Sequence, residues 1–95
     1  MNKDELQDLR ASLDNIDNAL VYLLAERFRI TGKVGVYKKA HGLPPVDPSR
    51  EASQLARIQQ LATQAGLDPD FAGRMLRVII DEVVQHHREI ADGKR

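Results

Sequence analysis

The chain of 95 residues carries 14 Lys and Arg against 14 Asp and Glu, and this formal net charge of zero at pH 7 provides no net field to attract nucleic acid or an anionic membrane. It has no cysteine, no apolar run long enough to span a bilayer and no signal-peptide pattern, which excludes disulfides and thiolate metal sites and predicts a cytoplasmic protein. Because so short a chain buries only about 60% of its unfolded surface, we expect a single domain, residues 1–95, that obtains further burial from another source.

The first predicted element is one long helix over residues 4–40. Apolar residues recur there every three or four positions, as in a heptad seam, and the range contains no proline. Gly32 and Gly35 each weaken a helix by about 1 kcal/mol relative to alanine, but the apolar pattern continues past both, so we expect the helix to continue as well. The seam consists of Leu6, Leu9, Leu13, Ile16, Leu20, Leu23, Ile30, Val34 and Tyr37.

This helix is too long for a globule of the chain's own size. It measures about 54 Å at 1.5 Å per residue, whereas a compact globule of this length is about 32 Å across. An exposed apolar seam is unfavourable in water, so we expect a second copy of the chain to cover it. The prediction is an intertwined homodimer. The alternative is a monomeric three-helix bundle whose first helix breaks at Gly32 or Gly35.

Two shorter helices are predicted after the first. Asp47 followed by Pro48 is typical of an N-cap and the first helical residue, and the helix that they begin ends at Gly66. The same Asp-Pro signal at positions 68 and 69 begins a third helix, whose apolar face continues to residue 90. We find no strand pattern and no repeat. The predicted fold class is therefore all-α, with three helices in each protomer.

Arg27 interrupts the apolar seam of the first helix. Counting heptads from Leu20 and Leu23 places an apolar residue at position 27, where the sequence has arginine. A charge on a buried stripe is unfavourable unless it is paired, and residues 27–39 contain five basic residues and no acidic one. Lys38 lies on the same face, about 16 Å along the helix axis. The two side chains are candidates to bind one small anion.

Other polar residues extend this candidate site. Arg10 lies on the same side of the helix but about 25 Å from Arg27, so it reaches the site only from an antiparallel partner helix, which gives a dimer two shared sites. At the start of the second helix, Asp47 is expected to cap the helix and Glu51 to accept from a ligand hydroxyl. Arg50 is either solvated or recruited to an anion, and the spacing leaves both open.

The third helix contributes His87, which shares a face with Ile80 and Val83 and is expected to point toward the core or a site that the core encloses. Glu82 and His86 would supply half of a metal site, but no third ligand of known position exists, and we expect no metal. The sequence contains no catalytic triad and no glycine-rich phosphate loop. The sequence therefore shows no residues typical of nucleophilic catalysis or of nucleotide binding.

Several short motifs follow one another between residues 6 and 90. They are Leu-Arg at 9–10, Leu-Leu-Ala-Glu-Arg at 23–27, Val-Gly-Val-Tyr-Lys at 34–38, Asp-Pro-Ser-Arg-Glu at 47–51 and Ile-Ile-Asp-Glu at 79–82. Each motif is weak alone, but the combination at these spacings is specific. It resembles the all-helical class of chorismate mutase, which implies an entwined dimer of three-helix protomers, with each site built from both chains.

The resemblance implies that the substrate is chorismate, a dianion, and that the product is prephenate. It further implies that Arg27 binds one carboxylate, that Arg10 of the other protomer binds the second, and that Lys38 contacts the ether oxygen together with a carboxylate. The reaction is a unimolecular pericyclic rearrangement, so no metal and no cofactor is expected. It is favoured by holding the reactive conformer and by cations placed where negative charge develops.

The remaining site residues follow from the same resemblance. Asp47 and Glu51 are implied to engage the nearby backbone of the first helix or the ring hydroxyl, and Arg50 to order that corner. The family usually has Ser at the position of Val83 and Gln or Glu at that of His87, and both departures touch the site. We hypothesise that His87 donates a hydrogen bond to the ether oxygen, either as the neutral ring or as the imidazolium.

Three alternatives to a mutase stay open. Isochorismate pyruvate lyase is similar in fold and also tolerates an aliphatic residue at position 83, but its loop differs from residues 47–51. A noncatalytic helical dimerisation module would bind nucleic acid through residues 27–39, against which net neutrality and the lack of aromatic stacking residues argue. A mutase-like chain that has lost its activity is the third alternative.

Overall fold

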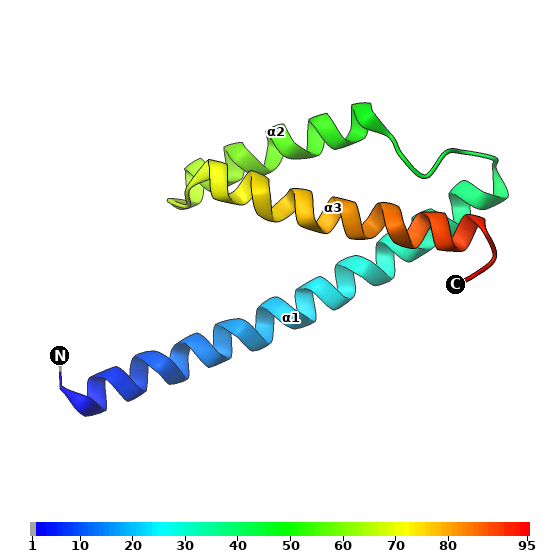
Figure 1. Ribbon diagram of the computed structural model, residues 1–95. Coiled ribbons are helices and arrows are strands. Elements are labelled where there is room, and N and C mark those ends of the chain that lie inside the picture. Colours follow the sequence, from blue (N-terminus) through cyan, green and yellow to red (C-terminus); the bar gives the residue numbers. More distant parts are fainter. Residues whose placement is uncertain (1) are drawn as a thin grey trace. The chain divides into compact units, whose positions relative to one another are not determined.

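The computed structural model describes residues 2–95, which form three helices and, within that range, no strand. The helices are α1 (Lys3–Ala40), α2 (Pro48–Ala65) and α3 (Pro69–Ala91) (Figure 1). The predicted all-α class and the three predicted helices are confirmed. In the described part of the chain, no helix combines the length and the apolar character that crossing a lipid bilayer requires.

Helix α1 continues through both of its internal glycines, as the apolar pattern predicts, and the break considered at Gly32 or Gly35 does not occur. Its N-terminus carries a reciprocal capping box. Asn2 Oδ1 accepts from the Glu5 N–H at 2.8 Å, and the Glu5 carboxylate accepts from the Asn2 N–H at 3.3 Å. Such pairs satisfy amide groups that have no partner within the helix.

The ends of α2 and α3 are set by local side chains, as predicted. The Asp47 carboxylate accepts from the Arg50 N–H at 3.1 Å and so caps α2. Asp68 accepts from the Asp70 N–H at 2.9 Å at the start of α3. Gly66 ends α2 with a φ of 78°, a left-handed conformation that glycine adopts without a steric penalty. The two helices follow each other in the chain and pack together as an αα-hairpin.

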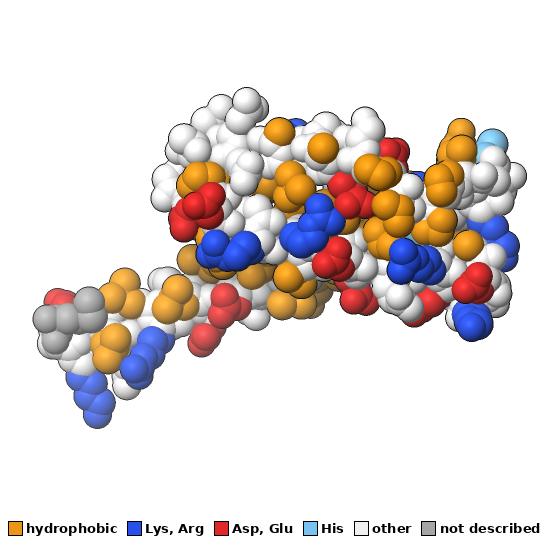
Figure 2. Space-filling view, turned by 45° about the horizontal axis from the view of Figure 1, so that its top comes forward, with side chains coloured by type: hydrophobic (Ala, Val, Ile, Leu, Met, Phe, Trp, Pro, Cys, Tyr) orange, Lys and Arg blue, Asp and Glu red, His pale blue; other side chains and the backbone are white. Residues whose placement is uncertain are grey.

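The chain divides into two units, residues up to Ile30 and residues Thr31–Arg95. The first unit is the N-terminal part of α1, and every described residue of it as far as Leu23 is exposed. Its exposed residues include the apolar seam, and Figure 2 shows orange apolar side chains at the surface of the molecule among charged ones. The first unit therefore contains an amphipathic helix whose apolar face is not covered within the unit.

The second unit contains the last ten residues of α1 together with α2 and α3. Helix α2 packs against α3, and small residues let the two helices approach closely. A Cβ at Gly73 would lie 3.1 Å from the Gln59 side-chain nitrogen, so α3 approaches the Gln59 side chain of α2 closely at this glycine. The buried apolar side chains of the unit are Ala62, Ala72, Leu76, Ile80 and Ile90, with His87 as the buried polar residue.

Candidate active site

Lys38 lies in the last turns of α1, within the second unit, and its side chain is half-buried. Its ammonium donates to the Pro45 carbonyl at 3.1 Å and contacts the His87 Nδ1 atom at 3.3 Å. Neither partner is a carboxylate, and no carboxylate within residues 2–95 forms an ion pair with Lys38. An ammonium has three N–H donors, so the third remains for a ligand, together with the whole positive charge.

His87 lies deeper than Lys38, since only 4% of its surface is exposed. Its Nε2 atom is 2.8 Å from the Thr31 carbonyl oxygen of α1. Gly35 lets the ring approach the helix, because a Cβ at that position would come within 2.7 Å of the His87 Cδ2 atom. The predicted orientation of His87 toward the core is confirmed, whereas its predicted hydrogen bond to the substrate stays a prediction.

The start of α2 holds three predicted site residues, of which Glu51 makes the most constrained contact. Its carboxylate accepts from Arg77 of α3 at 2.8 Å, and 17% of the Glu51 side chain is exposed against 43% of the Arg77 side chain. The hydrogen bond to Glu51 raises the pKa of Arg77, against the lowering effect of partial burial, and Asp81 at 3.6 Å adds to the increase. Arg77 therefore fixes the Glu51 carboxylate.

Sequence reasoning missed Arg77. It lies 26 residues from Glu51, and a contact at that separation leaves no periodic signal in the sequence. Arg50, in contrast, is exposed, and its guanidinium lies beside the Gln54 side chain, whose oxygen accepts at 3.1 and 3.3 Å when the amide is oriented toward it. Val83 is half-buried on α3. The structure thus brings Lys38 and His87 together and ties Glu51 to α3.

Arg27 belongs to the first unit and is partly buried. Its Nη1 atom is shielded from solvent and has no hydrogen-bond partner within the described chain. The adjacent Glu26 pairs with the exposed Arg29 instead. A buried guanidinium nitrogen without a partner is unusual in a native structure, so the unpaired charge expected at position 27 is confirmed. Arg10, also in the first unit, is exposed.

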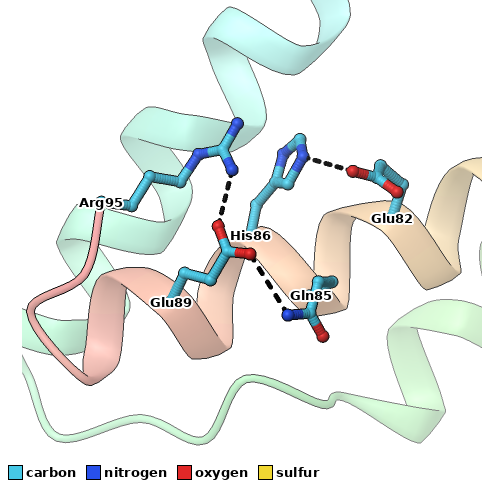
Figure 3. A network of polar contacts seen from close by, with 5 residues as sticks. All are labelled: Glu82, Gln85, His86, Glu89 and Arg95. Atoms are coloured by element: carbon cyan, nitrogen blue, oxygen red, sulfur yellow. Dashed lines mark hydrogen bonds and ion pairs between the residues drawn. The ribbon is translucent and has the colours of Figure 1, made fainter.

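A second polar network lies at the C-terminal end of α3 (Figure 3). Glu89 accepts from Arg95 at 2.7 Å and from Gln85 at 3.2 Å, and these bonds, that from Arg95 above all, lower the pKa of Glu89. His86 contacts Glu82 at 2.8 Å. Residues 2–95 contain no group of three side chains placed to hold a metal ion. The network joins the C-terminal tail to the last turns of α3.

Comparisons with known proteins show the family to which the chain belongs. A family model described as "Chorismate mutase type II" matches residues 9–88. The chain is 41% identical to the T-protein of Enterobacter agglomerans over 78 residues, which are 82% of this chain but 21% of that protein. The chain therefore spans about a fifth of the length of that relative.

Two shorter relatives are covered over most of their length. The chain is 35% identical to the 4-amino-4-deoxychorismate mutase of Streptomyces venezuelae over 81 residues. The aligned region covers 85% of this chain and 79% of that protein. It is 30% identical to the chorismate mutase of Methanocaldococcus jannaschii over 78 residues, which cover 82% of this chain and 79% of that protein. With a family match over most of its residues and three helices of the expected kind, the chain belongs to the type II chorismate mutase family.

Proposed function

We propose that this chain acts in the cytoplasm as an isomerase that rearranges chorismate to prephenate, in the biosynthesis of phenylalanine and tyrosine. The observation that carries the proposal is a pair of uncompensated cationic groups on α1. Within the described chain, Lys38 has a free N–H and no carboxylate partner, and Arg27 has a shielded nitrogen without a partner. Both features suit a small dianion. Membership in the type II chorismate mutase family supports this choice of substrate.

The proposed mechanism uses position and fixed charge. In the substrate an ether C–O bond breaks while a C–C bond forms, and negative charge grows on the ether oxygen. Arg27 binds one carboxylate, and Lys38 contacts the ether oxygen together with a carboxylate. A cation that is held in place before the reaction stabilises developing charge without reorganisation, which is the largest single effect in many enzymes. No nucleophile and no cofactor is required.

The proposal includes a homodimer in which Arg10 of one chain completes the site of the other. The exposure of the seam supports it, because Leu9, Leu13 and Ile16 are each about half exposed or more in the single chain. Leaving such a stripe in water is unfavourable, and burial of each large aliphatic side chain stabilises by about 1.5–3 kcal/mol. Asp47, Arg50, Glu51, Val83 and His87 are proposed to line or support the same site.

The test is a chorismate-disappearance assay on the purified chain with identification of the product, run beside a measurement of its mass in solution. Prephenate from a dimer is the expected result. Parallel reactions contain isochorismate and 4-amino-4-deoxychorismate, because the S. venezuelae relative is named for the latter. Pyruvate released from isochorismate would favour a lyase, and preference for the amino compound would change the proposed substrate. Inactivity with all three would reject the proposal.

A further inference from the structure

The His87 ring lies between two groups whose hydrogen-bonding roles are fixed. A carbonyl oxygen accepts only, so the Nε2 atom 2.8 Å from the Thr31 carbonyl must carry the proton and donate it. An ammonium donates only, so the Nδ1 atom 3.3 Å from the Lys38 nitrogen must be the unprotonated acceptor. The two contacts together define a single state of the ring, a neutral imidazole protonated at Nε2.

We infer that His87 is a positioning residue that acts on the reaction through Lys38, as a neutral acceptor at Nδ1, and that it gives no proton or hydrogen bond to the substrate. In the described structure neither ring nitrogen has an N–H left for a ligand. The inference deepens the proposed mutase function and rests on it for its kinetic part. It replaces the role of hydrogen-bond donor to the ether oxygen that the sequence suggested.

Helix α1 itself holds the ring in this state. Thr31 and Gly35 are one turn apart, so the carbonyl that receives Nε2–H also belongs to the helical ladder, and a carbonyl oxygen has lone pairs for both bonds. The missing side chain of Gly35 leaves the space that the ring fills, since a Cβ would lie 2.7 Å from Cδ2. Burial to 4% exposure keeps water from replacing either partner.

This arrangement orients Lys38 without neutralising it. A lysine side chain has four rotatable bonds, and two acceptors on different segments, Pro45 and His87, restrict where its ammonium points. A carboxylate in the place of His87 would orient the ammonium but cancel its charge. Two neutral acceptors leave the full charge and one N–H for the ether oxygen, which is what a fixed cation needs to stabilise developing negative charge.

The kinetic test compares His87→Asn with His87→Leu, which have nearly the same shape. The asparagine Oδ1 atom lies where Nδ1 was and accepts from Lys38, whereas leucine offers no acceptor. We expect His87→Leu to lower kcat at least tenfold more than His87→Asn, with KM changed less than kcat. A merely structural role would lower both variants together, because both lose the bond to Thr31. Equal losses in the two variants, with His87→Gln retaining activity, would overturn the inference in favour of a donor role.

The second test needs no turnover. In the full-length chain at neutral pH, ¹⁵N NMR of the three histidines, assigned by single substitutions, reports the tautomer of each ring. We expect His87 to be protonated at Nε2 alone, and Lys38→Met to shift its Nδ1 resonance toward that of a free ring nitrogen while Nε2 changes little. Protonation at Nδ1, or a Nδ1 resonance that is unchanged in the Lys38→Met variant, would overturn the inference. Absence of mutase activity would instead reject the proposed function, so the two failures are distinguishable.

Discussion

The two units of the chain use the same amphipathic period with opposite outcomes. Residues Thr31–Arg95 bury part of their apolar surface, five side chains from Ala62 to Ile90, because α2 packs against α3. Residues up to Ile30 have an equally regular stripe, yet Leu13 is 56% and Ile16 is 61% exposed. Periodicity therefore predicts which face must be covered, but a complementary surface is needed to cover it. Substitutions in the first unit therefore test the proposed dimer most directly.

The largest expected effect comes from a charge on that uncovered stripe. Leu13→Asp places a carboxylate where the proposed partner helix packs, and it does so in both chains of a dimer. We expect the dimer to dissociate and turnover to fall below detection, because a buried unpaired charge costs several kcal/mol. Sedimentation and the chorismate assay measure both effects. Ser12→Asp, at the adjacent position outside the seam, is the control, and we expect it to keep the dimer and the turnover. A dimeric, active Leu13→Asp variant would disprove the proposed packing of the two chains along the seam.

The next effect concerns the shielded guanidinium. Arg27→Ala should remove at least about 3 kcal/mol of transition-state stabilisation, a loss of more than about a hundredfold in kcat/KM, while the dimer stays intact. Arg29→Ala is the matched control, because Arg29 is exposed and already paired with Glu26, and it should change kcat/KM by a small factor only. Near-normal turnover of the Arg27 variant would refute its assignment to the substrate.

Two glycines of α1 provide a sharper comparison within the second unit. Alanine at Gly35 would place its Cβ 2.7 Å from His87 and from Ile90, whereas nothing lies within 4 Å of a Cβ at Gly32. We expect Gly35→Ala to destabilise by about 1–3 kcal/mol through overpacking and Gly32→Ala to stabilise by up to about 1 kcal/mol through helix propensity. Urea unfolding at one fixed protein concentration measures both. A destabilising Gly32→Ala would mean that a surface outside the described chain packs there.

A smaller effect is expected where α3 holds the start of α2. Arg77→Gln removes the partner of Glu51, and because the Arg77 side chain is 43% exposed we expect a loss of about 1 kcal/mol in unfolding free energy. Arg74→Gln, one turn earlier on an exposed position, controls for the charge change. High salt should reduce the difference between the two variants. Equal stabilities at low salt would show that the ion pair contributes nothing.

The smallest effect is the pH dependence at the C-terminal network. The pKa of Glu89 is lower in the folded chain, so its contribution is present above the usual glutamate pKa of about 4.3 and is lost as the pH falls through the folded value. The Glu89 side chain is 32% exposed and that of its partner Arg95 is 48% exposed, so the loss of unfolding free energy is small. Glu89→Gln should therefore flatten the fall in unfolding free energy between about pH 5 and pH 2. An unchanged pH profile would contradict the lowered pKa.

Local chemistry made most of the fold predictable. The caps at Asp47 and Gly66 act within one turn of the chain, and the continuation of α1 past Gly35 follows from the apolar pattern on either side of it. Position 27 was identifiable for the same reason, since a charge that interrupts a regular stripe is visible in the sequence itself. These features depend on neighbours a few residues away, so a linear reading contains the information that determines them.

The tertiary structure alone decided how the site residues are paired. The partner of Glu51 is 26 residues away, and the groups that set the state of the His87 ring, Thr31 and Lys38, are 56 and 49 residues away. The sequence placed His87 on an inward face, but it gave no sign that the ring contacts both Thr31 and Lys38. Periodicity determines the face on which a side chain lies, whereas the atoms that meet it depend on how distant helices pack, and no local pattern records that packing.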